Sequence, residues 1–276
     1  MLAAAFVSMR VQHEDATRMP TLSTLAQLSA VHAGWQEGDA LRVSPRWFDA
    51  ARIGFGDQRV LVEQTLSLHE LSGVRRVWLV EAGGHVEPAL PGEVSRETVV
   101  DDSDDGLVVR LAALSETQVI WDGRRELDEA TVTKGEQACD RWLDNNEWHC
   151  GARNEYIFVG RTIREMDLSP RQCIWMAAPE AGLHWRVEWT NVPAGALMLR
   201  AGNSYDAVRS GRGTDVHLRA ECNGEPCVEQ IFDVDDASFN SATVSFAGGT
   251  LALEVWAADH MDRFFCVHPL VVPASD

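Results

Sequence analysis

Aromatic and acidic side chains occur together near the C-terminal end of the chain, where they could hold a sugar. Apolar and other residues alternate over 251–256, which puts Glu254 and Trp256 on the face opposite the apolar one. If that face is exposed, the indole can stack on a sugar ring while the carboxylate accepts hydrogen bonds from the sugar hydroxyls. Glu254 and Trp256 are therefore candidate ligand-binding residues.

Two further tryptophans, Trp142 and Trp148, lie between Cys139 and Cys150 and are candidates for the same role. The alternative is that they and Trp256 pack between two parts of the chain, because large apolar surface is normally covered. The sequence leaves both interpretations open.

All six cysteines lie in the second half of the chain and none forms a CxxC pair, which argues against a zinc or thioredoxin-type site. An even number in one region predicts disulfides and an oxidising compartment. The favoured pairs are Cys222 with Cys227 across an Asn-Gly turn, Cys139 with Cys150 across a short loop and, by elimination, Cys173 with Cys266. The alternative is six reduced, buried cysteines.

An acidic loop, Asp233-Val-Asp-Asp236, separates two predicted strands and could hold a cation. Carboxylates and backbone carbonyls are the ligands that calcium takes in proteins. Asp233, Asp235 and Asp236 are therefore candidate ligands of a structural calcium ion, and no other cofactor is expected.

The sequence carries no catalytic motif: GxSxG, HExxH and the phosphate loop are all absent. The carboxylate pair of a glycoside hydrolase has a spatial rather than a sequential spacing, so it leaves no sequence signature. A hydrolase with two carboxyls about 5–9.5 Å apart across a cleft therefore stays an alternative to a non-catalytic role.

The formal net charge of −18 repels phosphate backbones and anionic membranes, so nucleic acid is not an expected partner. No stretch approaches the ~20 apolar residues of a membrane span. The apolar start, residues 1–9, has no basic segment before it. It is read either as an ordinary buried segment or as the remnant of a longer hydrophobic one.

The elements that would position these residues fall into two parts, and the first part alternates helices with strands. The helices are predicted over 21–33, 46–53 and 67–71, and the strands over 40–44, 59–63 and 75–81. This alternation favours a small α/β domain over residues 1–122. The rest of that domain is expected to be a Gly-, Pro- and Asp-rich loop over 83–106 and a hairpin of strands 107–114 and 117–121.

The highly charged residues 123–152 are the expected junction, with the Cys-bracketed loop and a helix near 134–143. Over 153–276 the pattern changes to period two, as in 183–190 and 251–256. Strands separated by Gly, Asn, Pro and Asp turns predict an all-β sandwich of jelly-roll type. The expected fold class is α+β with two domains, a small α/β domain followed by this sandwich.

Three segments of the first part resemble a known family: Gly38-Asp-Ala-Leu-Arg-Val-Ser-Pro-Arg-Trp47, Gly56-Asp57 and Arg75-Arg-Val-Trp-Leu-Val80. They look like the soluble region that follows the last membrane helix in bacterial polytopic glycosyltransferases of the dolichyl-phosphate-mannose mannosyltransferase type. The resemblance covers about residues 20–82. It implies a small α/β extracytoplasmic domain linked to envelope glycosylation. Catalysis in that family depends on acidic loops between membrane helices that this chain lacks, so the resemblance implies no catalytic residue here.

These observations favour a non-catalytic, extracytoplasmic accessory or binding protein, in the periplasm or at the cell surface. Its sandwich is expected to bind a glycan or an envelope protein. A structural or interaction protein without a small ligand is the first alternative, and the carboxylate-dependent hydrolase is the second.

Overall fold

The structure is a computed structural model of the chain, and it divides into two compact units. Residues 1–62 with 73–116 form unit 1, and residues 63–72 with 117–276 form unit 2. The residues that the structure describes are 29–44, 59–61, 66–102, 106–115, 118–142, 147–151, 157–166 and 169–274. The helix predicted over 46–53 lies outside them, and of the one predicted over 21–33 only the end, from residue 29, is described and is helical.

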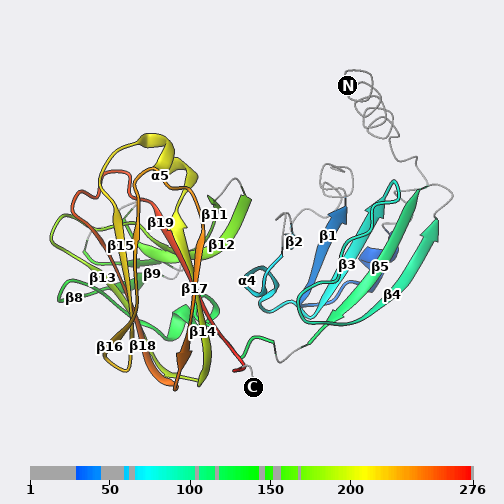
Figure 1. Cartoon of the computed structure of the whole chain (residues 1–276), viewed down its shortest axis with the longest axis horizontal. Helices are drawn as coiled ribbons and strands as arrows, with labels where there is room; N and C mark the ends of the chain where they lie inside the picture. The colour runs from blue at the N-terminus through cyan, green and yellow to red at the C-terminus, as the bar shows by residue number, and fades with distance from the viewer. Residues whose placement is uncertain are drawn as a thin grey trace, which may run out of the picture. The chain divides into compact units, whose positions relative to one another are not determined.

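Unit 1 contains a five-stranded sheet with the order β2-β1-β3-β5-β4 (Figure 1). Its strands are β1 (Asp39–Ser44), β2 (Val60–Leu61), β3 (Arg76–Ala82), β4 (Glu93–Asp102) and β5 (Leu107–Leu114). The pairs of β1 with β2 and β3 are parallel, whereas β5 runs antiparallel to β3 and β4. The core beside this sheet is formed by Val31, Leu41, Val43, Trp78, Val80, Leu107 and Val109.

The Gly-Asp and Arg-x-Trp segments of unit 1 meet in one polar cluster between β1 and β3. The pairing of Asp39 with Arg76 sets the register. The Asp39 carboxylate accepts hydrogen bonds from Arg76 Nε at 2.8 Å and Nη2 at 2.6 Å, and from Trp78 Nε1 at 2.9 Å. These residues therefore brace the sheet, since each buried polar group finds its partner on the neighbouring strand.

Two expectations for unit 1 are wrong. Residues 83–106 are not a continuous loop, because Glu93–Asp102 form the edge strand β4. The strand β5 pairs with β3 and β4, and not with the described residues 118–121. Residues Trp121–Asp122 instead form β6, which pairs with β19 in unit 2. The sequence did not predict β4, because this segment is rich in charged residues and lacks a strict apolar alternation.

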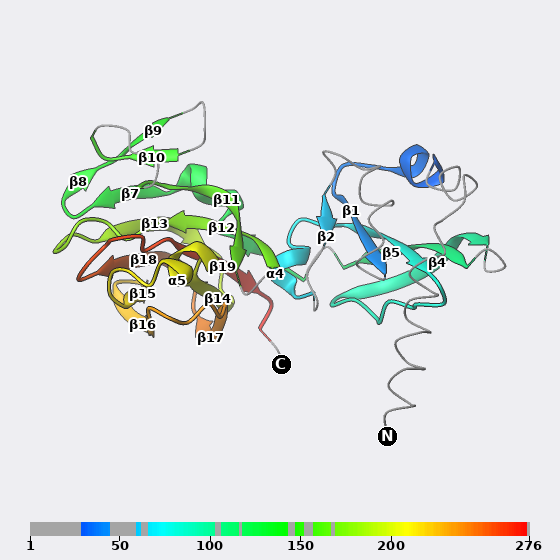
Figure 2. The same cartoon turned by 90° about the horizontal axis from the view of Figure 1, so that it is seen from above.

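Unit 2 is a β-sandwich, as predicted, with two antiparallel sheets. The first sheet has the order β17-β14-β19-β12-β11-β10-β9, and β6 pairs with β19 beside it. The second has the order β16-β15-β18-β13-β7-β8 (Figure 2). The jelly-roll assignment in particular stays a prediction.

The strands of unit 2 are short at first and long afterwards. The first group is β6 (Trp121–Asp122), β7 (Thr131–Lys134), β8 (Gln137–Ala138), β9 (Asp140–Trp142) and β10 (Glu147–His149), with a 3-10 turn at Arg125–Glu129. The second group is β11 (Val159–Met166), β12 (Ser169–Met176), β13 (Trp185–Val192), β14 (Gly195–Asn203), β15 (Val216–Cys222), β16 (Glu225–Phe232), β17 (Asn240–Phe246), β18 (Gly249–Ala257) and β19 (Phe265–Val272). The helices in the described part of unit 2 are α4 (Leu68–Leu71) and α5 (Tyr205–Ser210).

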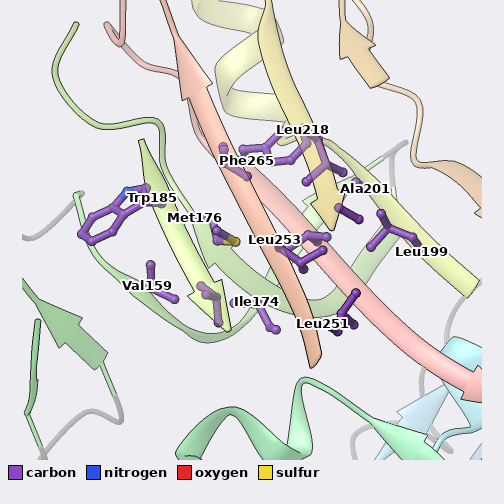
Figure 3. Packing of buried hydrophobic residues seen from close by; sticks show 14 of the residues in the cluster. Val159, Ile174, Met176, Trp185, Leu199, Ala201, Leu218, Leu251, Leu253 and Phe265 are labelled. Atoms are coloured by element: carbon purple, nitrogen blue, oxygen red, sulfur yellow. The ribbon is translucent and has the colours of Figure 1, made fainter. Parts of the chain in front are cut away.

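The sandwich core lies between the two sheets and is made by the alternate residues of their strands. Figure 3 shows Ile174 and Met176 of β12 in the same cluster as Leu251 and Leu253 of β18. Trp185 is also fully buried there, and its indole N–H donates to the Ala177 carbonyl at 2.6 Å. The period-two pattern of the sequence is therefore the pattern of core contact.

The expected junction, residues 123–152, contributes strands to both sheets of the sandwich: β7 and β8 belong to one, β9 and β10 to the other. Over 134–142, the described part of the helix expected near 134–143, the chain forms strands and a turn instead. Gly135, with a φ of 57°, closes a tight turn between β7 and β8, and Lys134 pairs with Gln137 across it. A turn at a left-handed glycine interrupts a helix there.

The helix α4 belongs to the sandwich although its sequence lies within the first part of the chain. Ser67 and Glu70 form a capping box at its start. Glu70 Oε1 then accepts hydrogen bonds from Arg171 Nη1 of β12 at 2.7 Å and from Arg200 Nη1 of β14 at 2.6 Å. Burial raises the pKa of Glu70. Arg200, Ser67 and Arg171 together lower it by a larger amount, so the pKa lies below its ordinary value.

A second buried contact joins the end of α4 to β6 and β19. The Ser72 hydroxyl donates to Asp122 Oδ2 at 2.5 Å, and His268 Nε2 lies 3.0 Å from Asp122 Oδ1. The His69 ring meets the His268 ring edge to face at 5.1 Å. Burial, followed by the charge of His268, lowers the pKa of His69 to about 3, so its imidazole is neutral in the folded protein.

All three predicted disulfides are present, and the alternative of six reduced cysteines is wrong in this structure. They are Cys139–Cys150, Cys173–Cys266 and Cys222–Cys227. The Cys173–Cys266 bond joins neighbouring strands β12 and β19 across 93 residues of sequence, and Cys222–Cys227 closes the β15–β16 hairpin.

Candidate functional site

The predicted ligand-binding residues Trp256 and Glu254 lie together on the outer face of the second sheet, on β18. Trp256 pairs with His217 of β15, which neighbours β18 on one side, and His184 precedes β13 on the other side. The indole stacks nearly parallel to both imidazoles, with ring centroids 5.2 Å from His217 and 4.7 Å from His184. Arg219 Cζ also lies 5.5 Å from the Trp256 ring centroid.

This arrangement limits what Trp256 can bind. Because an imidazole lies beside the indole from each neighbouring strand, the flat surface that would stack on a sugar is already in contact with the protein. The half-buried indole offers a ligand its edge.

Glu254 belongs to an ion-pair network around Arg186. Arg186 Nη1 donates to Glu254 Oε1 at 2.9 Å and to Glu221 Oε2 at 2.7 Å, while Nη2 donates to Glu188 Oε2 at 2.8 Å. Partial burial lowers the pKa of Arg186. The three carboxylates raise it by a larger amount, so the pKa lies above its ordinary value. The Glu254 carboxylate is therefore held by its own neighbours, as is the Trp256 ring.

The structure places Trp148 differently from the prediction. It is only 4% exposed, on β10, and belongs to the sandwich core, with Arg141 Cζ 5.4 Å from its ring centroid. A buried indole offers no surface to a ligand, so its candidate role is corrected to core packing. The side chain of Trp142 lies outside the described residues, although its backbone forms the end of β9.

A cavity of about 400 Å³ lies where loops meet at one end of the sandwich. Ile157 precedes β11, Ala177 and Ala178 follow β12, and the remaining lining comes from the loop between β18 and β19. That loop supplies His260, Met261, Asp262, Arg263 and Phe264. This site was not identified from the sequence, although the stretch His260-Met-Asp-Arg-Phe264 is an unusual mixture of polar and aromatic side chains.

The buried side chain of Arg263 holds the β18–β19 loop in its conformation. Its guanidinium is almost fully buried and donates to the carbonyls of Met261 at 3.3 Å, Val234 at 3.4 Å and Ala207 at 3.0 Å. Gly213 is required beside it, because a Cβ there would lie 2.6 Å from the Met261 oxygen and 2.7 Å from Arg263 Nε. One buried side chain thus ties together α5, the acidic loop and the cavity wall.

The aromatic wall of the cavity is held by a row of stacked rings on the outer face of the first sheet. Phe264 stacks on Trp175 with centroids 5.3 Å apart, and Trp175 in turn stacks on Phe158 at 6.1 Å. Arg164 Cζ lies 4.6 Å from the Trp175 ring centroid. Phe264 is only half-buried, so this row presents an apolar surface at the cavity.

In the acidic loop, the carboxylates accept hydrogen bonds from nearby groups of the same loop. Asp233 Oδ1 accepts from the N–H of Asp235 at 3.0 Å, and Asp236 accepts from the N–H and the hydroxyl of Ser238 at 2.8 and 2.7 Å. These bonds lower the pKa of Asp236 below its ordinary value. Among the described residues, no group of three or more His, Cys, Asp or Glu could hold a metal ion. The structural calcium ion at Asp233, Asp235 and Asp236 stays a prediction.

The cavity lining combines polar and apolar groups. Its described polar groups are one imidazole, one carboxylate and one guanidinium. Apolar surface from Phe264, Met261 and Ile157 lies beside the polar groups of His260 and Asp262. Within the described part of the chain, no helix is both long and apolar enough to cross a membrane.

No family model and no curated protein matches the chain. Similar solved structures include CBM51 from Clostridium perfringens GH95 in complex with methyl-galactose, at 12% identity and a TM-score of 0.33, covering 51% of this chain and 92% of that one. The tandem CBM51 modules of a family 98 glycoside hydrolase from Streptococcus pneumoniae match at 12% identity and a TM-score of 0.31, over 61% and 55% of the two chains. A family 35 carbohydrate binding module from Clostridium thermocellum matches at 12% identity and a TM-score of 0.30, over 55% and 99%.

Proposed function

We propose that the sandwich is a non-catalytic glycan-binding module and that its ligand site is the cavity formed by the β18–β19 loop. The observation that carries this proposal is the pairing of a half-buried ring, Phe264, with the polar groups of His260 and Asp262 in one cavity. A sugar ring has apolar C–H faces and a polar edge of hydroxyls, so it needs both kinds of surface at once.

The size of the cavity supports a small unit of a glycan. Its volume of about 400 Å³ falls within the range of small-ligand sites, roughly 300–1,000 Å³. Arg263 and the stacked row behind Phe264 hold the walls in place before any ligand arrives. A preformed site loses little conformational entropy on binding, which suits a weak, reversible contact with a sugar.

A glycan-array screen of the full chain tests the proposal, with three variants. Phe264→Ala removes the apolar wall and His260→Ala removes a polar group from the half-buried loop; each is expected to weaken binding by about tenfold or more, or about 1.4 kcal/mol. Trp256→Ala is the matched control, because it truncates a half-buried aromatic ring on the outer sheet face and should leave binding unchanged.

The proposal fails if no glycan binds, or if Trp256→Ala abolishes binding while His260→Ala does not. The second result would return the site to Trp256 and Glu254. Circular dichroism of each variant separates lost binding from lost folding, and His260→Ala keeps the test valid if Phe264→Ala is unstable.

The wider role that we propose is that of an extracytoplasmic accessory protein linked to envelope glycosylation. The three disulfides support an oxidising compartment. The Gly-Asp and Arg-x-Trp segments support the link to glycosyltransferases through their resemblance to the soluble regions of those enzymes. Six free thiols in the protein isolated from its own cell would contradict this placement.

A further inference from the structure

We propose that the cavity selects its glycan by charge, taking an amine-bearing sugar and rejecting anionic sugars such as uronates. This inference rests on the proposed glycan binding and names the ligand class of the same site. It follows from which of the charged groups around the cavity can still reach a ligand.

The guanidinium that lines the cavity is committed to the protein. Arg263 is 1% exposed, and its Nε, Nη1 and Nη2 donate to the carbonyls of Met261, Val234 and Ala207. Nη2 also lies 3.5 Å from the Ser210 hydroxyl. Bonding an anionic sugar would require breaking these contacts, so Arg263 supports the loop and gives little to a ligand.

The carboxylate that lines the cavity is accessible. The Asp262 side chain is 30% exposed, and its Oδ2 lies 3.2 Å from Nη1 of Arg212, whose side chain is 58% exposed. An exposed ion pair of this kind contributes about 0–1 kcal/mol. An ammonium group that enters the cavity can therefore replace Arg212 as the partner of Asp262 at small cost.

The surrounding charges act in the same direction. Asp215, Asp235 and Asp259 all act electrostatically on Arg263, in addition to Asp262. Glu180 interacts electrostatically with His260 and pairs with Lys134 at 3.3 Å. Such a cluster of carboxylates makes the local potential negative and raises the local concentration of cations.

The test is isothermal titration calorimetry of the full chain with three oligosaccharides of equal length. One is made of glucosamine, one of N-acetylglucosamine and one of glucuronate. We expect the glucosamine oligomer to bind about tenfold more tightly than its N-acetylated counterpart, and the glucuronate oligomer to bind least. The preference should shrink between about 0.05 M and about 0.5 M salt, because salt screens charges beyond a few ångströms.

Two variants locate the effect. Asp262→Asn should reduce glucosamine binding by a larger factor than N-acetylglucosamine binding. Glu225→Gln makes the same change of charge on the exposed β15–β16 hairpin and should leave the preference unchanged. If the N-acetylated or the glucuronate oligomer binds as tightly as the glucosamine oligomer, the inference is overturned while the proposed function stands. If none of the three binds, and the array finds no glycan, both are overturned.

Discussion

The outer faces of the two sheets carry similar charged residues but hold them in different environments. On the first sheet, α4 covers Arg171 and Arg200, and the side chains of Glu70 and Arg171 are 6% and 7% exposed. On the second sheet, Arg186 lies among three glutamates with its side chain 30% exposed. Both clusters place one charge among several of the opposite sign.

The difference teaches that burial, and not the number of ion pairs, decides what such a cluster contributes. A buried charge that loses its partner keeps the full cost of desolvation, which is about 3–5 kcal/mol. An exposed charge that loses its partner is solvated by water, at a cost of about 0–1 kcal/mol. The charges on the first face therefore fix α4 in place, whereas each ion pair on the second face is expected to contribute little to stability.

The largest effect is expected from Glu70→Ala. It removes the carboxylate that contacts both Arg171 and Arg200, and leaves the two guanidinium charges under α4 without that partner. We expect the free energy of unfolding of the sandwich to fall by about 3–5 kcal/mol. Urea denaturation followed by tryptophan fluorescence measures this. A loss under 1 kcal/mol would show that the α4 face contributes no more than a surface network.

This contact also marks the limit of what could be foreseen from the sequence. The short helix at 67–71 was predicted from the sequence, and the structure adds that Ser67 and Glu70, three residues apart, form its capping box. Its partners were not, because Arg171 and Arg200 lie 101 and 130 residues away in the chain and nothing in the local pattern points to them.

The other features also fall into two groups: those that the local sequence predicts, and those that depend on residues far apart in the chain. Alternation predicted β13 and β18, since the period of two is a property of the strand itself. The stacking of His184 and His217 on Trp256 depends on the register of three strands, and the cavity depends on loops from separate strand pairs. Neither arrangement leaves a local signal, so the predicted site was placed on the sheet face and the cavity was missed.

The dependence of stability on pH is a second test of the comparison between the buried and the exposed charge clusters. The pKa of His69 is lowered from 6.5 to about 3 in the folded protein, so protons bind the unfolded chain first. This group therefore does not change the folding stability above about pH 6.5, and it lowers the stability progressively as the pH falls from 6.5 toward 3. Asp122 and Glu70 also have lowered pKa values, so their contributions disappear below about pH 4, in the same direction.

At about 1.4 kcal/mol for each pKa unit, we expect a loss of a few kcal/mol between pH 6.5 and pH 3. Urea denaturation at a series of pH values measures it, with His69→Gln as the informative variant. That variant has no imidazole to titrate, so its stability should change little until the pH falls below about 4. An unchanged slope between pH 6.5 and pH 4 in His69→Gln would assign the acid sensitivity to other groups.

The smallest effect is expected from Arg186→Ala on the second face. The change leaves Glu188, Glu221 and Glu254 close together, but Arg219 still lies 3.8 Å from Glu254 and water reaches all of them. We expect a loss of about 1 kcal/mol or less in urea denaturation, and a smaller loss at high salt, because screening weakens the repulsion between the remaining carboxylates. If Arg186→Ala instead cost as much as Glu70→Ala, exposure would not be the property that separates the two faces. The ion-pair network beside Trp256 would then be a structural brace for the strands β13, β15 and β18, which it joins.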